Sequence, residues 1–197
     1  MLFRSAHAHG CKFHVDGARF ANALVTLGCS AADATWRAGV DLLSFGATKN
    51  GALAAEAIVV FDPALAETIG YRRKRAGHLF SKMRFLSAQL EAYLKDDLWL
   101  RNARHANAMA TRAATGLQRL ANRGVAFAHP TEANELFVRL PNTVRDGLTR
   151  DGFLFHGWGP PVPGAPDSVV RLVTAWNTDP ADVDALIQRA THHAGAK

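Results

Sequence analysis

Short apolar runs punctuate the first third of the chain and predict buried strands. The runs Cys11–Val15, Val40–Phe45 and Ala57–Phe61 are bounded by turn-forming residues, which is typical of strands buried in a sheet. Ser30 before Ala31–Trp36 predicts a short helix with a serine N-cap. A strand, a helical crossover and a second strand favour parallel pairing of the first two strands in a right-handed βαβ unit.

Helical patterns dominate the middle of the chain. Residues 1–10 predict the end of a helix that stops at Gly10. Asp62, followed by a proline, predicts the N-cap of a helix that runs into a basic cluster. Apolar residues at helical spacing predict two further helices, over Phe80–Tyr93 and Asp97–Asn122.

The last third of the chain alternates short strands with two helices and predicts a compact α+β region. Strands are expected at Val125–Ala128, Glu135–Leu140, Phe153–His156 and Val169–Ala175, and helices at Thr143–Asp151 and Pro180–Ala194. The whole chain is therefore expected to have an α/β fold.

Composition adds few constraints. Nearly half of the 197 residues are apolar, which allows a sizeable core. The two cysteines, Cys11 and Cys29, are too few for a disulfide framework and are expected to be buried thiols. No apolar run approaches the roughly 18 residues of a membrane span, so we expect a cytoplasmic protein without a membrane partner. The spacing of His7, His9, Cys11 and His14 matches no established zinc pattern, and no metal ligand is predicted.

The charge balance raises the question of a nucleic-acid partner. The formal net charge is +6, and the sharpest basic cluster is Arg72–Arg75 at the end of a predicted helix. Cations suit the C-terminal end of a helix dipole, and no aromatic stacking platform accompanies them. We therefore expect a solvated helix end or a role between subunits, and no nucleic-acid binding.

One lysine stands out because of its place between two predicted core strands. Lys49 lies in a Thr-Lys-Asn-Gly turn between Val40–Phe45 and Ala57–Phe61. A lysine held in such a place can form Schiff bases with carbonyl compounds or pyridoxal phosphate, although most lysines in turns are simply solvated. Asp16 ends the preceding strand, and ligands of open α/β sheets bind at the carboxyl ends of strands. A buried aspartate is the partner that a protonated pyridine nitrogen needs, so the pair fits a pyridoxal phosphate site.

Three motifs in order carry a resemblance to a known family. They are His14-Val-Asp16-Gly-Ala-Arg19-Phe-Ala-Asn22-Ala, Ser44-Phe-Gly-Ala-Thr-Lys49-Asn-Gly51 and Glu56-Ala-Ile-Val-Val-Phe61. Together they resemble the low-specificity L-threonine aldolases, within the beta-eliminating lyase/threonine aldolase family. These are pyridoxal 5'-phosphate enzymes of the aspartate-aminotransferase fold type I.

The resemblance implies roles for five residues. Lys49 would be the catalytic Schiff-base lysine, and Asp16 would bind the pyridine nitrogen of the cofactor. Arg19 would face the cofactor and the substrate carboxylate. Arg171, in an Arg-Leu-Val-Thr strand, would grip that carboxylate in a bidentate fork, although an arginine on an exposed edge strand is the plainer interpretation. Lys74 would lie near the site as a further substrate-binding residue.

The resemblance also implies an organisation and an activity. The chain would comprise a partial large domain with its connecting helix, residues 1–122, and a small α+β domain, residues 123–197. It would correspond to the C-terminal part of such an enzyme, without the phosphate-binding loop and the ring-stacking histidine, and could be inactive alone. The whole enzyme would be a homodimer or homotetramer with its site at the subunit interface.

The implied reaction is aldol cleavage of L-threonine, L-allo-threonine and related β-hydroxy-α-amino acids to glycine and an aldehyde. Another fold type I enzyme, either a β-eliminating lyase or an aminotransferase, is the first alternative. A non-catalytic fragment, or a basic binding protein that uses Arg72–Arg75, is the second.

Overall fold

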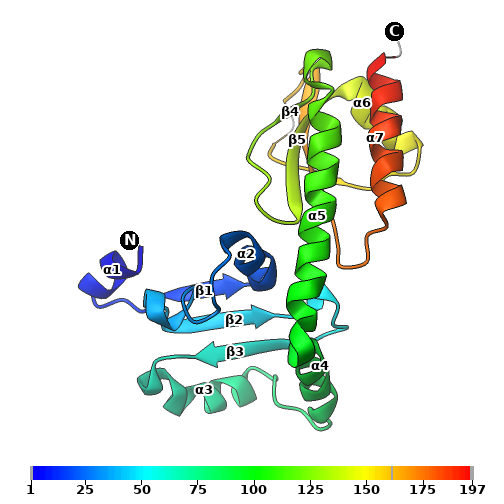
Figure 1. The fold of residues 1–197 in the computed structure, drawn as a ribbon. Coiled ribbons are helices and arrows are strands. Elements are labelled where there is room, and N and C mark those ends of the chain that lie inside the picture. Colours follow the sequence, from blue (N-terminus) through cyan, green and yellow to red (C-terminus); the bar gives the residue numbers. More distant parts are fainter. Residues whose placement is uncertain (1, 161, 196–197) are drawn as a thin grey trace. The chain divides into compact units, whose positions relative to one another are not determined.

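The computed structural model describes residues 2–160 and 162–195. The chain divides into two compact units, Met1–Asn102 and Ala103–Lys197, and the division falls inside helix α5 (Leu98–Gln118) (Figure 1). The domain boundary expected near residue 122 lies just after this helix and stays a prediction.

The first unit is built on a three-stranded sheet. Its strands are β1 (His14–Gly17), β2 (Leu42–Gly46) and β3 (Glu56–Val60), in the order β1-β2-β3 (Figure 1). Strand β1 runs parallel to β2, and β2 runs antiparallel to β3. The three strands and the parallel pairing of the first two are therefore confirmed.

The crossover between β1 and β2 differs from the sequence-based expectation. Its helix is α2 (Phe20–Leu27), which Gly28 ends at a φ of 63°. Residues 31–35 form turns instead of the predicted helix. The Ser30 hydroxyl does accept the Asp33 N–H, at 3.1 Å, but Thr35 bonds back to the Ala31 carbonyl. Such side-chain bonds to the backbone compete with regular helix formation.

The remaining helices of this unit largely follow the apolar spacing. They are α1 (Leu2–Ala8), α3 (Pro63–Arg75), α4 (Arg84–Leu94) and the first residues of α5. The Asp62 carboxylate caps α3 as predicted, accepting the Ala64 N–H at 3.0 Å. Helix α4 starts later than predicted because Lys82 has a φ of 66°, and α5 starts at Leu98 because Asp97 has a φ of 56°. Backbone in the left-handed region cannot continue a right-handed helix.

Four aromatic rings form the centre of the first unit's core. Phe20, Phe45, Tyr93 and Trp99 pack with ring centroids 5.8–6.4 Å apart, and Leu43 is buried beside them. Aromatic pairs of this kind contribute about 0.5–1.5 kcal/mol each beyond the burial of their area. The rings fasten β2 and α2 to α4 and the start of α5.

The cysteines are not buried as expected. Cys11 is exposed and Cys29 is partly exposed. Cys11 precedes the first residue of strand β1, His14, and directly follows the turn after α1. Its N–H donates to the carbonyl of Ala6 in that helix. The apolar run around Cys11 therefore belongs partly to a surface turn.

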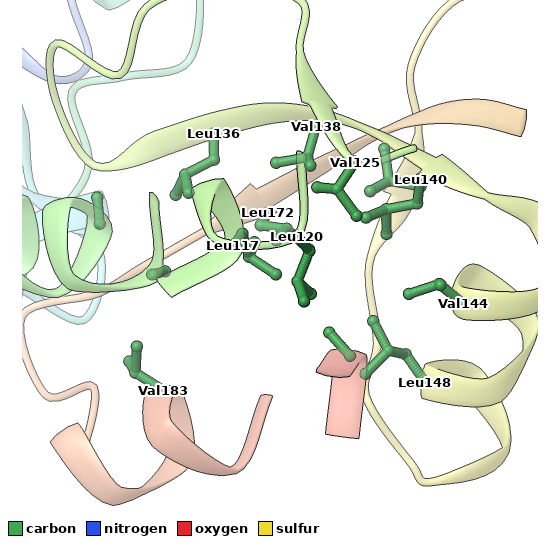
Figure 2. Close-up of a cluster of buried hydrophobic side chains, with 14 residues drawn as sticks. Leu117, Leu120, Val125, Leu136, Val138, Leu140, Val144, Leu148, Leu172 and Val183 are labelled. Carbon is green, nitrogen blue, oxygen red and sulfur yellow. The ribbon is translucent and has the colours of Figure 1, made fainter. Parts of the chain in front are cut away.

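The second unit is an antiparallel sheet covered by helices. The predicted strands and helices are confirmed to within a few residues, except that the strand expected at Phe153–His156 overlaps the observed strand only at His156. Its strands are β4 (Ala126–Phe127), β5 (Glu135–Pro141), β6 (His156–Gly157) and β7 (Asp167–Val173), in the order β4-β5-β7-β6, and its helices are the rest of α5, α6 (Asn142–Arg150) and α7 (Pro180–Gly195). Alternate residues of β5 are fully buried, namely Leu136, Val138 and Leu140. They pack with Leu148 and Leu172 in one core (Figure 2). This alternation is the signature of a strand with one buried face.

Asp151 joins the C-terminal end of α6 to α7. Arg189 donates from Nε and Nη2 to the two carboxylate oxygens, at 2.7 and 2.9 Å. His193 Nε2 lies 2.7 Å from Oδ2. The hydrogen bond from Arg189, and then that from His193, holds the pKa of Asp151 well below its usual range.

We expect Asp151→Asn to lower thermal stability at neutral pH and this loss to shrink in acid. Because the folded-state pKa is depressed, the carboxylate stabilises the fold fully above its unfolded pKa of about 4. The contribution is lost as pH falls through the folded-state value. Melting curves of wild type and variant across this range measure the difference. Asp146→Asn, which removes an exposed pair with adjacent Arg145, is the control and should change the melting temperature less. A difference of equal size at every pH would contradict the expectation.

No helix within the described ranges, 2–160 and 162–195, is both long and apolar enough to cross a bilayer.

Candidate active site

Asp16 and Lys49 lie at the same edge of the three-stranded sheet. Asp16 pairs with Ser44 in the parallel β1–β2 register, one residue before β1 ends. Lys49 lies in the 3-10 helix Thr48–Asn50, called the Lys49 turn below, which follows the end of β2. Strands β1 and β2 point in the same direction (Figure 1), so their carboxyl ends meet at one edge. Both side chains are exposed there, within reach of a ligand from solvent, so Asp16 is not the buried aspartate expected from the sequence.

Two glycines let the backbone of the turn after Asp16, called the Asp16 turn below, pack against the backbone of β2. A Cβ at Gly17 would lie 2.6 Å from the Ser44 carbonyl oxygen. A Cβ at Gly46 would lie 2.8 Å from Ala18 Cα, which is closer than real Cβ contacts allow. One Asp16 oxygen also accepts the Ala18 N–H, at 3.0 Å, and this bond orients the carboxylate. The glycines therefore fix the spacing between the two strand ends.

The loop between β2 and β3 is held by side chains on both sides of the Lys49 turn. Thr48 donates its N–H to Glu56 Oε1 at 3.3 Å, and its hydroxyl accepts the Ala55 N–H at 3.2 Å. Gln89 of α4 accepts the N–H groups of residues 53 and 54, at 3.0 and 3.2 Å. The loop is thus tied to the first residue of β3 and to helix α4.

Asn50 anchors the turn to the interior of the unit. Its side chain is buried and donates to Tyr93 Oη at 2.6 Å and to the Trp99 carbonyl at 2.8 Å. Its own carbonyl accepts from Asn102 Nδ2 at 2.9 Å. Burial raises the pKa of Tyr93, so its hydroxyl is neutral and accepts the amide N–H.

The sequence-based reasoning did not find Asn50, Glu56 or Gln89 as supports of the turn. Asn50 was visible as a polar residue inside the Thr-Lys-Asn-Gly motif. Its partners lie 43–52 residues further along the chain, and no local pattern identifies such pairs. A polar residue beside a candidate catalytic lysine is the only sequence signal that pointed to it.

Arg19 lies close in sequence to the Asp16 turn. It immediately precedes α2 and is half-buried. On the neighbouring strands, His14 Nε2 lies 2.8 Å from Ser44 Oγ. Because alternate strand residues share a face, His14 and Asp16 project from the same side of β1. The part of Arg19 in ligand binding stays a prediction.

Lys74 lies on a different element, in the last turn of α3. It is exposed and shares a shallow hollow with Thr68, Tyr71, Arg72 and Arg75. Cations at this end of a helix are favourably placed in the helix dipole. A substrate-binding part for Lys74 stays a prediction.

Arg171 belongs to the second unit and lies on β7, which has β5 on one side and β6 on the other. The edge-strand interpretation is therefore wrong. The guanidinium lies 5.7 Å from the ring centre of Trp158, and Nη1 lies 3.7 Å from Glu135 Oε1. The Trp158 ring in turn packs on Phe137, 4.8 Å between centroids. The side chain is held on two sides but keeps 31% of its surface exposed, which leaves room for a ligand.

No group of three or more histidine, cysteine, aspartate or glutamate residues is arranged to hold a metal ion in the part of the chain that the structure describes.

Comparison with known proteins connects this geometry to a family. The sequence profile of the beta-eliminating lyase family matches residues 2–143. The low specificity L-threonine aldolase of a Pseudomonas strain is 41% identical over 177 residues, 90% of this chain and 49% of that protein. The enzyme of the same name from Pseudomonas aeruginosa is 43% identical over 170 residues, 86% of this chain and 47% of that protein. The chain thus spans about half the length of these relatives.

A solved structure gives the same result. The threonine aldolase of Leishmania major superposes with a TM-score of 0.87 at 28% identity, covering 98% of this chain and 55% of that one. The similarity confirms the α/β fold expected from the sequence, which is that of the fold type I pyridoxal phosphate enzymes. Because the profile covers most of its length, the chain belongs to the beta-eliminating lyase family.

Proposed function

We propose that this chain supplies the Schiff-base lysine and the pyridine-binding carboxylate of a pyridoxal 5'-phosphate-dependent threonine aldolase. The whole enzyme would cleave L-threonine, L-allo-threonine and related β-hydroxy-α-amino acids to glycine and an aldehyde. The observation that carries the proposal is the position of Lys49 and Asp16 at one carboxyl edge of the parallel β1–β2 pair. The aldolases named above, which match the chain over most of its length, support it.

The residues present fit the cofactor. An exposed primary amine matches its aldehyde, and an exposed carboxylate oriented by the Ala18 N–H matches its pyridine nitrogen. Both groups extend from strand ends whose spacing is fixed by Gly17 and Gly46. When bound, the cofactor supplies an electron sink for the electrons of the bond that breaks at Cα.

Each side chain would have a distinct task. The Lys49 amine would bind the aldehyde carbon covalently, and Asp16 would hold a proton on the pyridine nitrogen by charge and hydrogen bonding. Arg19 and Arg171 would bind the substrate carboxylate, and a guanidinium fork fixes its orientation. That orientation decides which bond at Cα stands perpendicular to the ring. Lys74 would add positive charge near the substrate.

The assembly and location are part of the same proposal. The enzyme would be a homodimer or homotetramer with its site between subunits, and the basic end of α3 would lie near a neighbouring subunit. The location would be the cytoplasm, which fits a chain with two free cysteines.

Chemical trapping tests the proposal directly. The purified chain is mixed with pyridoxal phosphate, reduced with borohydride and digested, and labelled lysines are identified by mass spectrometry. We expect the label on Lys49 in preference to Lys12, which is also exposed. Lys12 precedes the first residue of β1, away from the carboxyl end of that strand, and forms an ion pair with Asp62. Acetaldehyde release from L-threonine is then measured, beside ammonia and keto acid release from other amino acids. Equal labelling of Lys49 and Lys12 would contradict the proposal, and keto acid without acetaldehyde would favour another fold type I enzyme, a β-eliminating lyase or an aminotransferase.

A further inference from the structure

We propose that Asn50 is a positioning residue that holds the Lys49 turn and thereby presents the Lys49 amine at the sheet edge. The inference rests on the proposed function of Lys49, but its structural part can be measured without the cofactor. Asn50 would touch neither cofactor nor substrate, because the residue is 3% exposed and both of the described donor bonds of its side chain go to protein atoms.

The geometry of a short 3-10 helix couples Asn50 to Lys49. Successive side chains in a helix of three residues per turn point about 120° apart. Asn50 points into the unit, whereas Thr48 and Lys49 are exposed. Fixing the Asn50 side chain inward therefore fixes the direction in which Lys49 points outward.

The anchor has three separate attachments. The carboxamide donates to the Tyr93 hydroxyl on α4 and to the Trp99 carbonyl at the start of α5. The Asn50 backbone carbonyl receives the third bond, from Asn102 of α5. Tyr93 and Trp99 also belong to the aromatic core, so the turn is fixed to the packed interior of the unit.

Both ends of the turn are constrained as well. Ala47 is fully buried, and its carbonyl accepts the N–H groups of Asn50 and Ala52 at 3.0 and 3.2 Å. Gly51 follows with a φ of 116°, a conformation that side-chain-bearing residues rarely adopt. The backbone is thus constrained before and after the turn. The Asn50 carboxamide ties the turn itself to helices α4 and α5.

The same position could be explained as a buried asparagine that only stabilises the fold. That explanation predicts lower thermal stability with unchanged Lys49 chemistry in variants that remain folded. A positioning role predicts that Lys49 loses its preferential reaction even where the chain is folded, because misplacing a reacting group by about 1 Å costs up to roughly 100-fold.

The experiment compares four variants with the wild-type chain at a temperature where circular dichroism shows each to be folded. Asn50→Ala removes both donor bonds, and Asn50→Asp keeps the shape but replaces the donor by an acceptor facing the Trp99 carbonyl. Tyr93→Phe removes one acceptor and keeps the ring. Gln89→Ala is the matched control, because it releases residues 53 and 54 of the same loop but not the turn.

The first measurement is amide hydrogen exchange without cofactor. We expect the N–H groups of residues 50 and 52 to exchange on the order of tenfold faster in both Asn50 variants, less so in Tyr93→Phe, and unchanged in Gln89→Ala. Unchanged exchange in the Asn50 variants would overturn the inference, whatever the cofactor does.

The second measurement is the ratio of borohydride-fixed pyridoxal phosphate on Lys49 to that on Lys12. We expect this ratio to fall about tenfold or more in the Asn50 variants. Faster exchange with an unchanged ratio would overturn the positioning role. A wild-type chain without preference for Lys49 would instead count against the proposed function, and the exchange data alone would then decide whether Asn50 holds the turn.

Discussion

Replacing Lys49 by alanine is expected to abolish borohydride-fixed pyridoxal phosphate at the sheet edge and, in the whole enzyme that we propose, to lower threonine cleavage by at least about 10³-fold. The reason is that no other group can replace the primary amine as the covalent attachment, and loss of a covalent catalytic group commonly costs this much or more. The Lys49 side chain is exposed, so its truncation leaves the packed core unchanged. Thermal stability should therefore stay close to that of the wild-type chain.

Two further variants test whether the primary amine at position 49 is required. Lys49→Arg keeps the positive charge, but its guanidinium stays protonated and cannot form a Schiff base, so it should behave like alanine. Lys12→Ala removes an exposed lysine whose ammonium bonds Asp62 at 2.6 Å, and it should keep both labelling and cleavage. Label fixed to the sheet-edge peptide of Lys49→Ala, or cleavage at the wild-type rate, would show that another amine carries the chemistry.

Leu136→Ala is expected to lower the free energy of unfolding of the second unit by about 2–5 kcal/mol. The Leu136 side chain is fully buried on β5, opposite Leu172 of β7 in the antiparallel register. Truncation removes its transfer free energy and leaves a cavity that the packed core of Figure 2 fills only in part. Urea unfolding followed by circular dichroism measures the change.

The chain offers a matched control in the same unit. Leu154 is 93% exposed, and Leu154→Ala removes the same atoms from a position where they make little contact. Its effect should stay within about 0.5 kcal/mol of zero. Similar losses for the two leucines would mean that this core does not hold the unit together.

The second unit was more predictable from sequence than the first for a physical reason. Its strand β5 alternates buried residues with more exposed ones, which is the periodic pattern of a strand with one buried face. In the first unit, α2 was missed because its signal is short. The turns at 31–35 follow Ser30 and contain an aspartate and a threonine, and these residue types also suit a helix start.

Some features of the candidate site could likewise be predicted from the sequence, and others could not. The placement of Asp16 and Lys49 at one edge followed from the two strand ends, which are local signals, and from the parallel pairing that a helical crossover favours. The anchors of the Lys49 turn did not follow, because Tyr93 and Trp99 lie 43 and 49 residues beyond Asn50 and meet it only through the tertiary fold. The contacts of Arg171 with Trp158 and Glu135 likewise depend on strand register.

The contact of backbone with backbone at Gly17 and Gly46 has a consequence for engineering. Since a methyl group at either position would collide with main-chain atoms, the separation of the two strand ends is not a variable that substitution can tune. A library for new substrates gains nothing from randomising these glycines, and most of its members would be lost to misfolding. Diversity is better placed at exposed positions beyond the strand ends, where side chains face solvent and the backbone frame is left intact.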